Sequence, residues 1–158
     1  MIETLEYKAL SAAKDAVECA RQKGANMDDL GNAATKAWGV LQEHGIFAAF
    51  LWLAAQGRAT EREKEGDRQQ LSSRTKKVYE KEPIASISRA LWKSLNDSDL
   101  VESELNKEER RPALKACELL ANADSGLFRN LSKLLLARRI LEQVLLYLRY
   151  CAKASGER

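Results

Sequence analysis

The segment LFRNLSKLLLARRILEQVLLYLRYCAKA, residues 127–154, decides the fold class of this chain. Its leucines and other apolar residues recur at intervals of three and four, which is the period of one face of a helix. Apolar residues cover most of the helix circumference, so most of its surface requires burial against the rest of the protein. We therefore predict one long, largely buried C-terminal helix over these residues.

A row of charged side chains follows one side of this predicted helix. The row consists of Arg138, Glu142, Arg149 and Lys153, at positions i, i+4, i+11 and i+15, with Arg139 beside it. This spacing places the side chains above one another on one face. Because positive charges outnumber the single negative one, the row predicts a surface that meets a polyanion or an acidic partner.

Two leucines extend the same row toward the beginning of the helix. Leu131 and Leu135 precede Arg138, so the face is half apolar and half cationic. We expect the first turns to form a protein interface and the last turns to approach phosphate.

The remaining sequence predicts more helices and no substantial sheet. The chain has 158 residues, of which 45% are hydrophobic and 31% charged, with only 8 Gly and 2 Pro. Ala, Leu, Glu, Lys and Arg dominate, and these are strong helix formers. Sustained alternation of β-branched and aromatic residues is missing. We predict an all-α protein, a compact bundle of about six to seven helices that forms a single domain over residues 1–158.

Local signals suggest where the helices begin and end. Gly24 is predicted to end the first helix. The second helix is predicted to begin after a cap at Asn26 or Asp28 and to end at the His44-Gly45 pair. Pro83 is predicted to lie in the first turn of a later helix. The stretch IFAAFLWLAAQ, residues 46–56, is apolar almost all round and is predicted to lie at the centre of the domain. The expected helices span residues 2–23, 28–44, 46–56, 72–81, 84–95, 100–105 with 108–123, and 127–154.

One segment stands apart as a charged connection. Residues 57–71, GRATEREKEGDRQQL, have no apolar stripe before the final leucine, so we expect an exposed connection there. A second basic cluster, Arg74, Lys76 and Lys77, follows directly. Charge is otherwise concentrated at the C-terminus, where residues 127–158 hold seven Lys and Arg against two Glu in a chain of net charge +3. This distribution fits a nucleic-acid contact over part of the surface.

The residue inventory gives little support to catalysis. The single histidine, His44, has no His or Cys neighbours at ligand spacing, and no glycine-rich phosphate-binding motif occurs. We expect no enzyme activity, no metal and no cofactor. Three widely spaced cysteines, no signal-like N-terminus and no apolar stretch long enough for a bilayer predict a cytoplasmic protein without membrane contact.

Most aromatic residues fall in apolar helical stretches and are expected in the core. Trp92 is the exception, because its neighbours Arg89 and Lys93 favour partial exposure and a contact with RNA.

Two segments resemble a known family. They are LQEHGIFAAFLWLAAQ, residues 41–56, and EQVLLYLRYCAKAS, residues 142–155. They resemble the small α-helical subunit of the Cmr complex, the type III-B CRISPR effector. His44-Gly45-Ile46 stands where that family tends to have Asn-Gly-Leu, and Ala49-Phe50-Leu51 matches its Ala-Phe-Leu. The second segment looks like the closing helix of the family, although Tyr150 replaces a frequent Trp-Leu-Lys step.

The resemblance implies a noncatalytic subunit of an RNA-guided antiviral complex. Copies of it would stack along the backbone subunits that carry crRNA, help to bind target RNA and bridge to the large polymerase-type subunit. On this hypothesis the first candidates for RNA binding are Arg138, Arg139, Arg149 and Lys153, and the second are Arg74, Lys76 and Lys77.

Three alternatives remain open. The chain is a type III-A small subunit, or a helical protein-interaction or self-assembly module that touches no RNA. This module would stack through the apolar surface of the last helix, where the seam residues are Leu127, Leu131, Leu134, Leu141, Leu145 and Leu148. The third and weakest is a DNA-binding regulator, which has little support because the helix after Gly45 is too apolar to face a groove.

Overall fold

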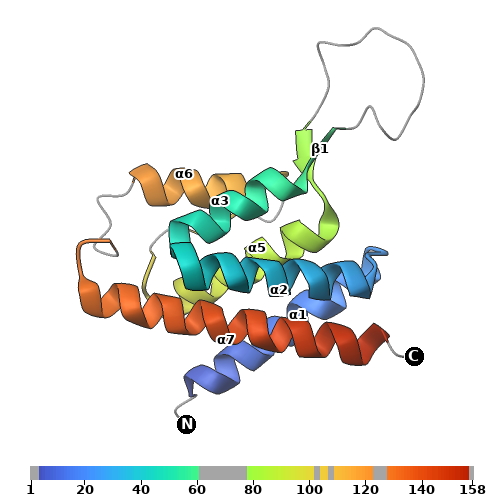
Figure 1. Ribbon diagram of the computed structural model, residues 1–158, viewed down its shortest axis with the longest axis horizontal. Coiled ribbons are helices and arrows are strands. Elements are labelled where there is room, and N and C mark those ends of the chain that lie inside the picture. Colours follow the sequence, from blue (N-terminus) through green and yellow to red (C-terminus); the bar gives the residue numbers. More distant parts are fainter. Residues whose placement is uncertain (1–3, 61–77, 102–103, 107–108, 123–127, 157–158) are drawn as a thin grey trace, which may run out of the picture.

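The computed structural model describes residues 4–60, 78–101, 104–106, 109–122 and 128–156. Within these ranges the chain forms six helices and one small hairpin, so the predicted all-α bundle is confirmed (Figure 1). The helices are α1 (Leu5–Gln22), α2 (Met27–His44), α3 (Ile46–Gly57), α5 (Glu82–Asp97), α6 (Pro112–Asn122) and α7 (Leu131–Gly156).

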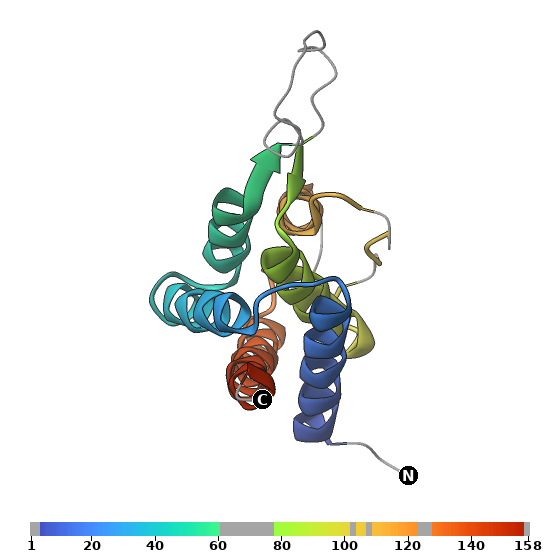
Figure 2. The ribbon, with the colours of Figure 1, turned by 90° about the vertical axis from the view of Figure 1, so that its right-hand side faces the viewer.

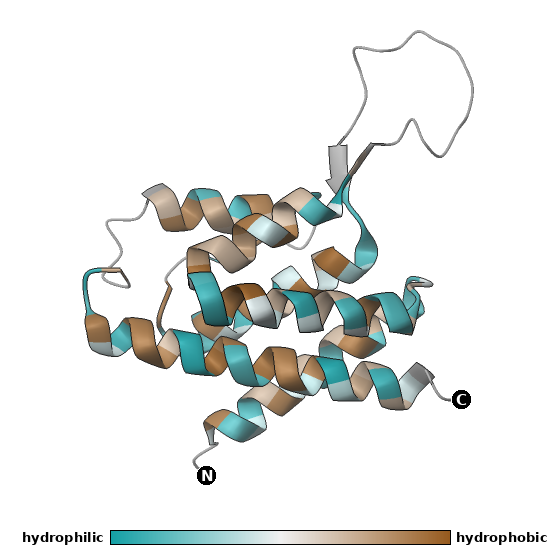
Figure 3. Cartoon of the chain, in the orientation of Figure 1, coloured by the Kyte–Doolittle hydropathy of each residue, from teal (hydrophilic) through white to brown (hydrophobic). Residues whose placement is uncertain are grey.

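Helix α5 is the centre of the bundle. It contacts each of the other five described helices, and Figure 2 shows it between α3 and α6 above and α1 and α7 below. The prediction that residues 46–56 form the central helix is therefore wrong. Helix α3 packs on α2, α5 and α6 but leaves Phe47 and Leu51 exposed to solvent. Its apolar residues therefore outnumber those that its neighbours cover. Figure 3 shows much of the α3 ribbon in the brown shades of hydrophobic residues.

Local capping sets the beginnings of the first helices. Thr4 caps α1 by accepting a hydrogen bond from the amide of Tyr7 at 3.1 Å. The Oδ1 atom of Asn26 accepts from the amide of Asp28 at 2.7 Å, which confirms one of the two predicted caps of α2. Gly45, at φ 94°, separates α2 from α3 in a conformation that disfavours any residue with a Cβ atom.

The chain leaves α3 as a strand. Strand β1 (Arg58–Thr60) pairs antiparallel with β2 (Val78–Glu80), and Arg58 stands opposite Glu80. The predicted exposed connection over 57–71 is therefore wrong at its beginning, since Gly57 and Ala59 are buried. The predicted helix over 72–81 is wrong at residues 78–80. Residues 61–77 lie outside the described residues, and with them the rest of the connection.

The hairpin stem is fixed by its surroundings. The amide of Lys81 donates to the carbonyl of Gly57 at 2.8 Å, and the amide of Glu80 donates to the carbonyl of Arg110 at 2.9 Å. A Cβ atom at Gly57 would lie 2.6 Å from Cγ2 of Ile84, so only glycine allows this approach of α3 to α5. These contacts outweigh the helix-forming tendency of the neighbouring Glu and Lys residues.

Two helices are shorter than the sequence predicted. Leu100, Val101 and residues 104–106 are not helical, and α6 begins only at Pro112. Proline disfavours helical backbone at the residue before it, which explains the late beginning. Helix α7 begins at Leu131 because the side chain of Asn130 caps it, accepting from the amide of Lys133 at 3.1 Å.

One apolar core joins all six helices. Phe50 and Trp92 meet edge to face within it, with ring centroids 6.0 Å apart. Trp92 is only 2% exposed, so the prediction that it is partly exposed for RNA contact is wrong. No helix among the described residues combines the length and the apolar character that crossing a membrane requires.

Candidate nucleic-acid interface

Helix α7 presents one buried and one exposed side. Its buried side chains pack against α1, α2 and α5. They are Ala137, Ile140, Leu141, Val144, Leu145, Leu148 and Ala152. The helix therefore lies along the bundle with its opposite side free of the core (Figure 1). The candidate interface is on this opposite side.

The exposed side changes character along its length. Leu131 and Leu135 are 69% and 57% exposed, and Arg139, Arg149 and Lys153 are exposed further along the helix. Positions 131, 135, 139, 149 and 153 fall within one helical stripe. The structure thus brings the two predicted interface leucines and three of the predicted RNA-binding residues to one side of α7, with the apolar end first and the basic end last.

Arg138 lies at the edge of this stripe and contacts α2. Its Nη2 atom donates to the carbonyl oxygen of Gln42 at 2.7 Å, and its Nε atom donates to Oε2 of Glu142 at 3.4 Å. Gln42 in turn donates to Glu142 at 2.6 Å. The guanidinium therefore neutralises the carbonyl end of α2, where a cation is favourable. Its side chain remains 38% exposed, so Arg138 has a structural contact in addition to any external one.

The basic end of the stripe includes an aromatic ring. The Cζ atom of Arg149 lies 5.7 Å from the ring centroid of Tyr150, within cation–π range. Tyr150 itself is exposed, and Lys153 lies one helical turn further on.

Helix α1 brings a cation near residue 151, on the side of α7 opposite the stripe. Burial raises the pKa of the Cys151 thiol, and the positive charge of Lys14 partly opposes that rise. Lys14 therefore lies close enough to residue 151 to act on it electrostatically, and its side chain is exposed. Nothing local in the sequence of α1 indicates which residues of α7 Lys14 meets.

The second group of predicted RNA-binding residues lies elsewhere. Arg74, Lys76 and Lys77 are outside the described residues, so the structure assigns them no position.

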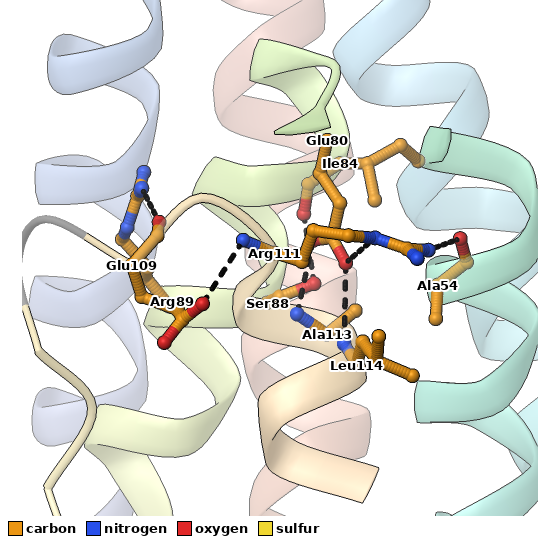
Figure 4. A network of polar contacts seen from close by, with 9 residues as sticks. All are labelled: Ala54, Glu80, Ile84, Ser88, Arg89, Glu109, Arg111, Ala113 and Leu114. Atoms are coloured by element: carbon orange, nitrogen blue, oxygen red, sulfur yellow. Dashed lines mark hydrogen bonds and ion pairs between the residues drawn. The ribbon is translucent and has the colours of Figure 1, made fainter. Parts of the chain in front are cut away.

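A separate polar cluster joins the hairpin to α6 (Figure 4). The carboxylate of Glu80 accepts hydrogen bonds from the amides of Ala113 at 2.9 Å and Leu114 at 3.1 Å. Arg111 lies beside it, with Nε 3.7 Å from Oε2 of Glu80, and donates from Nη2 to the carbonyl of Ala54 at 2.8 Å. Glu80 thus caps α6 from β2, in place of the residue that precedes the helix.

Glu80 has the raised pKa of a catalytic acid, but its carboxylate is not accessible to a substrate. Burial raises the pKa of Glu80, although the two amide hydrogen bonds and the charges of Arg111 and Arg89 oppose the rise. A raised carboxyl pKa is a common mark of catalytic sites. Here both oxygens already serve the first turn of α6, and the Glu80 side chain is fully buried. The arrangement is that of a structural cap.

Among the described residues, no three or more His, Cys, Asp and Glu side chains gather in a group that could hold a metal ion. A shallow groove of about 150 Å³ lies between α1 and α5, with an alanine-rich lining that includes Ala12, Ala16 and Ala90. No protein-family model matches this chain, and no curated protein and no solved structure is significantly similar to it.

Proposed function

We propose that this chain is a noncatalytic small subunit of an RNA-guided effector complex of the Cmr type, and that it helps to bind target RNA through α7. The assignment to the type III-B family rests on the resemblance of residues 41–56 and 142–155, and type III-A is the adjacent alternative. The observation that carries the RNA contact is the exposed stripe of α7, which ends in Arg149 and Lys153.

The charge and shape of this stripe suit phosphate contact without sequence readout. Cations on the outer side of a helix attract a polyanion and release its counterions, whatever the base sequence is. Arg139, Arg149 and Lys153 all project from one rigid element that is packed against three others. A subunit that must accept any target sequence needs contacts of this kind.

The experiment reverses these charges in the assembled complex. The variant Arg139→Glu, Arg149→Glu, Lys153→Glu leaves Arg138 in place, so the contact with α2 is preserved. We expect weaker binding of target RNA and a shallower dependence of affinity on salt, by about 2 in the logarithmic slope if each cation meets one phosphate, at about 0.7 per contact.

A matched control keeps the total charge change and moves it to another part of the bundle. Arg58, Arg110 and Lys115 are exposed residues on the hairpin, before α6 and on α6. Replacing these three with Glu is expected to leave the salt slope unchanged. Equal loss of affinity in both triple variants would mean that net charge matters and the α7 stripe does not.

The apolar end of the stripe supports a second candidate function, self-association. Phe128, Leu131, Leu135 and Leu136 are exposed large hydrophobic residues within three turns of one another. Exposed apolar residues grouped in this way mark protein–protein contacts. The test is light scattering over a range of concentrations with the wild type and the Leu131→Gln, Leu135→Gln variant. A monomer at every concentration in both proteins would remove this candidate.

A further inference from the structure

The exposed ring of Tyr150 is the least expected feature of the α7 stripe. Its side chain is 56% exposed although a buried apolar environment lies on the other side of the same helix. The guanidinium of Arg149 lies over the ring at 5.7 Å, which holds it beside a positive charge. An exposed aromatic ring next to an arginine is the combination on which unpaired nucleobases stack.

Two cations of α7 accompany this ring. The guanidinium of Arg149 lies over it, and Lys153 is exposed one helical turn further on. From residue 143 to residue 156 the helix contains no Asp or Glu. The side chains that α7 itself contributes over its last turns are therefore positively charged or uncharged.

These observations point to one class of ligand. The face of a nucleobase is accessible in a single strand but is covered by its neighbours in a duplex. We propose that Tyr150, with Arg149 and Lys153, binds single-stranded RNA, in which one unpaired base stacks on the tyrosine ring and the flanking phosphates meet the two cations. This inference deepens the proposed function, on which it rests, by specifying the strandedness of the RNA that α7 contacts.

The test measures binding of RNA by the purified full chain. The probe is a fluorescently labelled uridine-rich single strand of about 12 nucleotides, compared with the same strand in a duplex, because single-strand sites span about 4–16 nucleotides. The variants are Tyr150→Leu, Tyr150→Phe and Lys153→Gln. Both positions, 150 and 153, are exposed, and circular dichroism verifies that each of the three variants folds.

The expected results separate stacking from charge. Tyr150→Leu weakens single-strand binding at least about fivefold and leaves duplex binding within about twofold, since stacking on one base accounts for about 1 kcal/mol or more. Tyr150→Phe retains most of the affinity because its ring is intact. Lys153→Gln weakens both RNAs and reduces the salt slope.

Two results would overturn the inference. One is single-strand affinity that is unchanged in Tyr150→Leu while the wild type binds RNA. In that case the cations alone bind and the proposed function stands. The other is a wild-type chain that binds no single strand at all. Failure of the proposed function itself has a different signature, namely a chain that does not co-purify with an RNA-containing complex.

Discussion

Removal of the Glu80 carboxylate is the perturbation whose effect follows most directly from the structure. In Glu80→Ala the amides of Ala113 and Leu114 lose their acceptors at the first turn of α6, and Arg111 loses its ion-pair partner. Ala113 is fully buried, so its amide depends on this carboxylate for an acceptor. A buried donor without an acceptor costs about 1–3 kcal/mol.

The net magnitude is smaller than the sum of these losses. Burial of the carboxylate is itself unfavourable, and this cost disappears in the variant. Arg111 also keeps its hydrogen bond to Ala54. We therefore expect the free energy of unfolding to fall by about 3 kcal/mol, toward the lower end of the range for breaking a buried ion pair.

The assay is urea unfolding followed by circular dichroism, with Glu118→Ala as the control. Glu118 is an exposed carboxylate on the same helix, with Lys115 3.9 Å away, so its removal is expected to change stability by less than about 0.5 kcal/mol. Hydrogen exchange provides a local readout, since the Ala113 amide is expected to exchange faster in Glu80→Ala. A loss of less than about 1 kcal/mol, or equal losses in both variants, would refute the capping role.

The same carboxylate predicts a pH dependence. Burial raises the pKa of Glu80 above its ordinary value of 4.5, so the folded protein holds this proton more tightly than the unfolded chain does. The resulting stabilisation is fully present below the ordinary pKa and is lost as pH rises through the raised one. The free energy of unfolding of the wild type should therefore decline relative to Glu80→Gln across that interval. A difference that is constant or grows with pH would contradict the raised pKa.

Three further predictions concern other parts of the bundle. Arg138→Ala removes the contact with α2 and is expected to lower the free energy of unfolding by about 1 kcal/mol, after allowance for the exposure of Arg138. Arg139→Ala is expected to leave the free energy of unfolding unchanged and to weaken RNA binding. Equal stability of the two variants would contradict these different roles. Gly57→Ala forces a clash with Ile84 of α5 and is expected to lower the free energy of unfolding, measured with denaturant, by about 1–3 kcal/mol. At Gly39 a Cβ atom meets open space, so Gly39→Ala is expected to stabilise α2 by about 0.5–1 kcal/mol. A Gly57→Ala variant more stable than the wild type would refute the close approach of α3 to α5. Cys117 is buried, and desolvation is the chief cause that raises its pKa to about 11. Time-resolved alkylation followed by mass spectrometry should therefore find Cys117 the slowest of the three thiols to react. Early modification of Cys117 would contradict its burial in the core.

The features that the sequence predicted well are local ones. Asn26 caps α2, Gly45 separates α2 from α3, and Pro83 lies in the first turn of α5, because each acts on backbone within a few residues of itself. The exposed row of Arg139, Arg149 and Lys153 was also predictable, since helical periodicity alone determines which residues share a face.

The features that the sequence did not predict depend on long-range contacts. Glu80 lies in the run YEKE, residues 79–82, which is typical of a solvated surface, yet it caps a helix more than thirty residues away. Arg138 reaches Gln42, at a separation of 96 residues. Trp92 is buried although charged residues flank it, because α5 is surrounded by the other helices and Arg89 donates to the carbonyl of Glu109. None of these partners has a signal in the neighbouring sequence.

The central claim is that the chain belongs to an RNA-guided complex and contacts its RNA through α7. The most direct test is to tag the chain in its host, purify it under mild conditions, and analyse the bound RNA and proteins. The account predicts a large assembly that contains CRISPR RNA, with the tagged chain cross-linking to RNA through α7 peptides that include Arg149 and Lys153. Recovery of the chain without CRISPR RNA and without a large complex would contradict it.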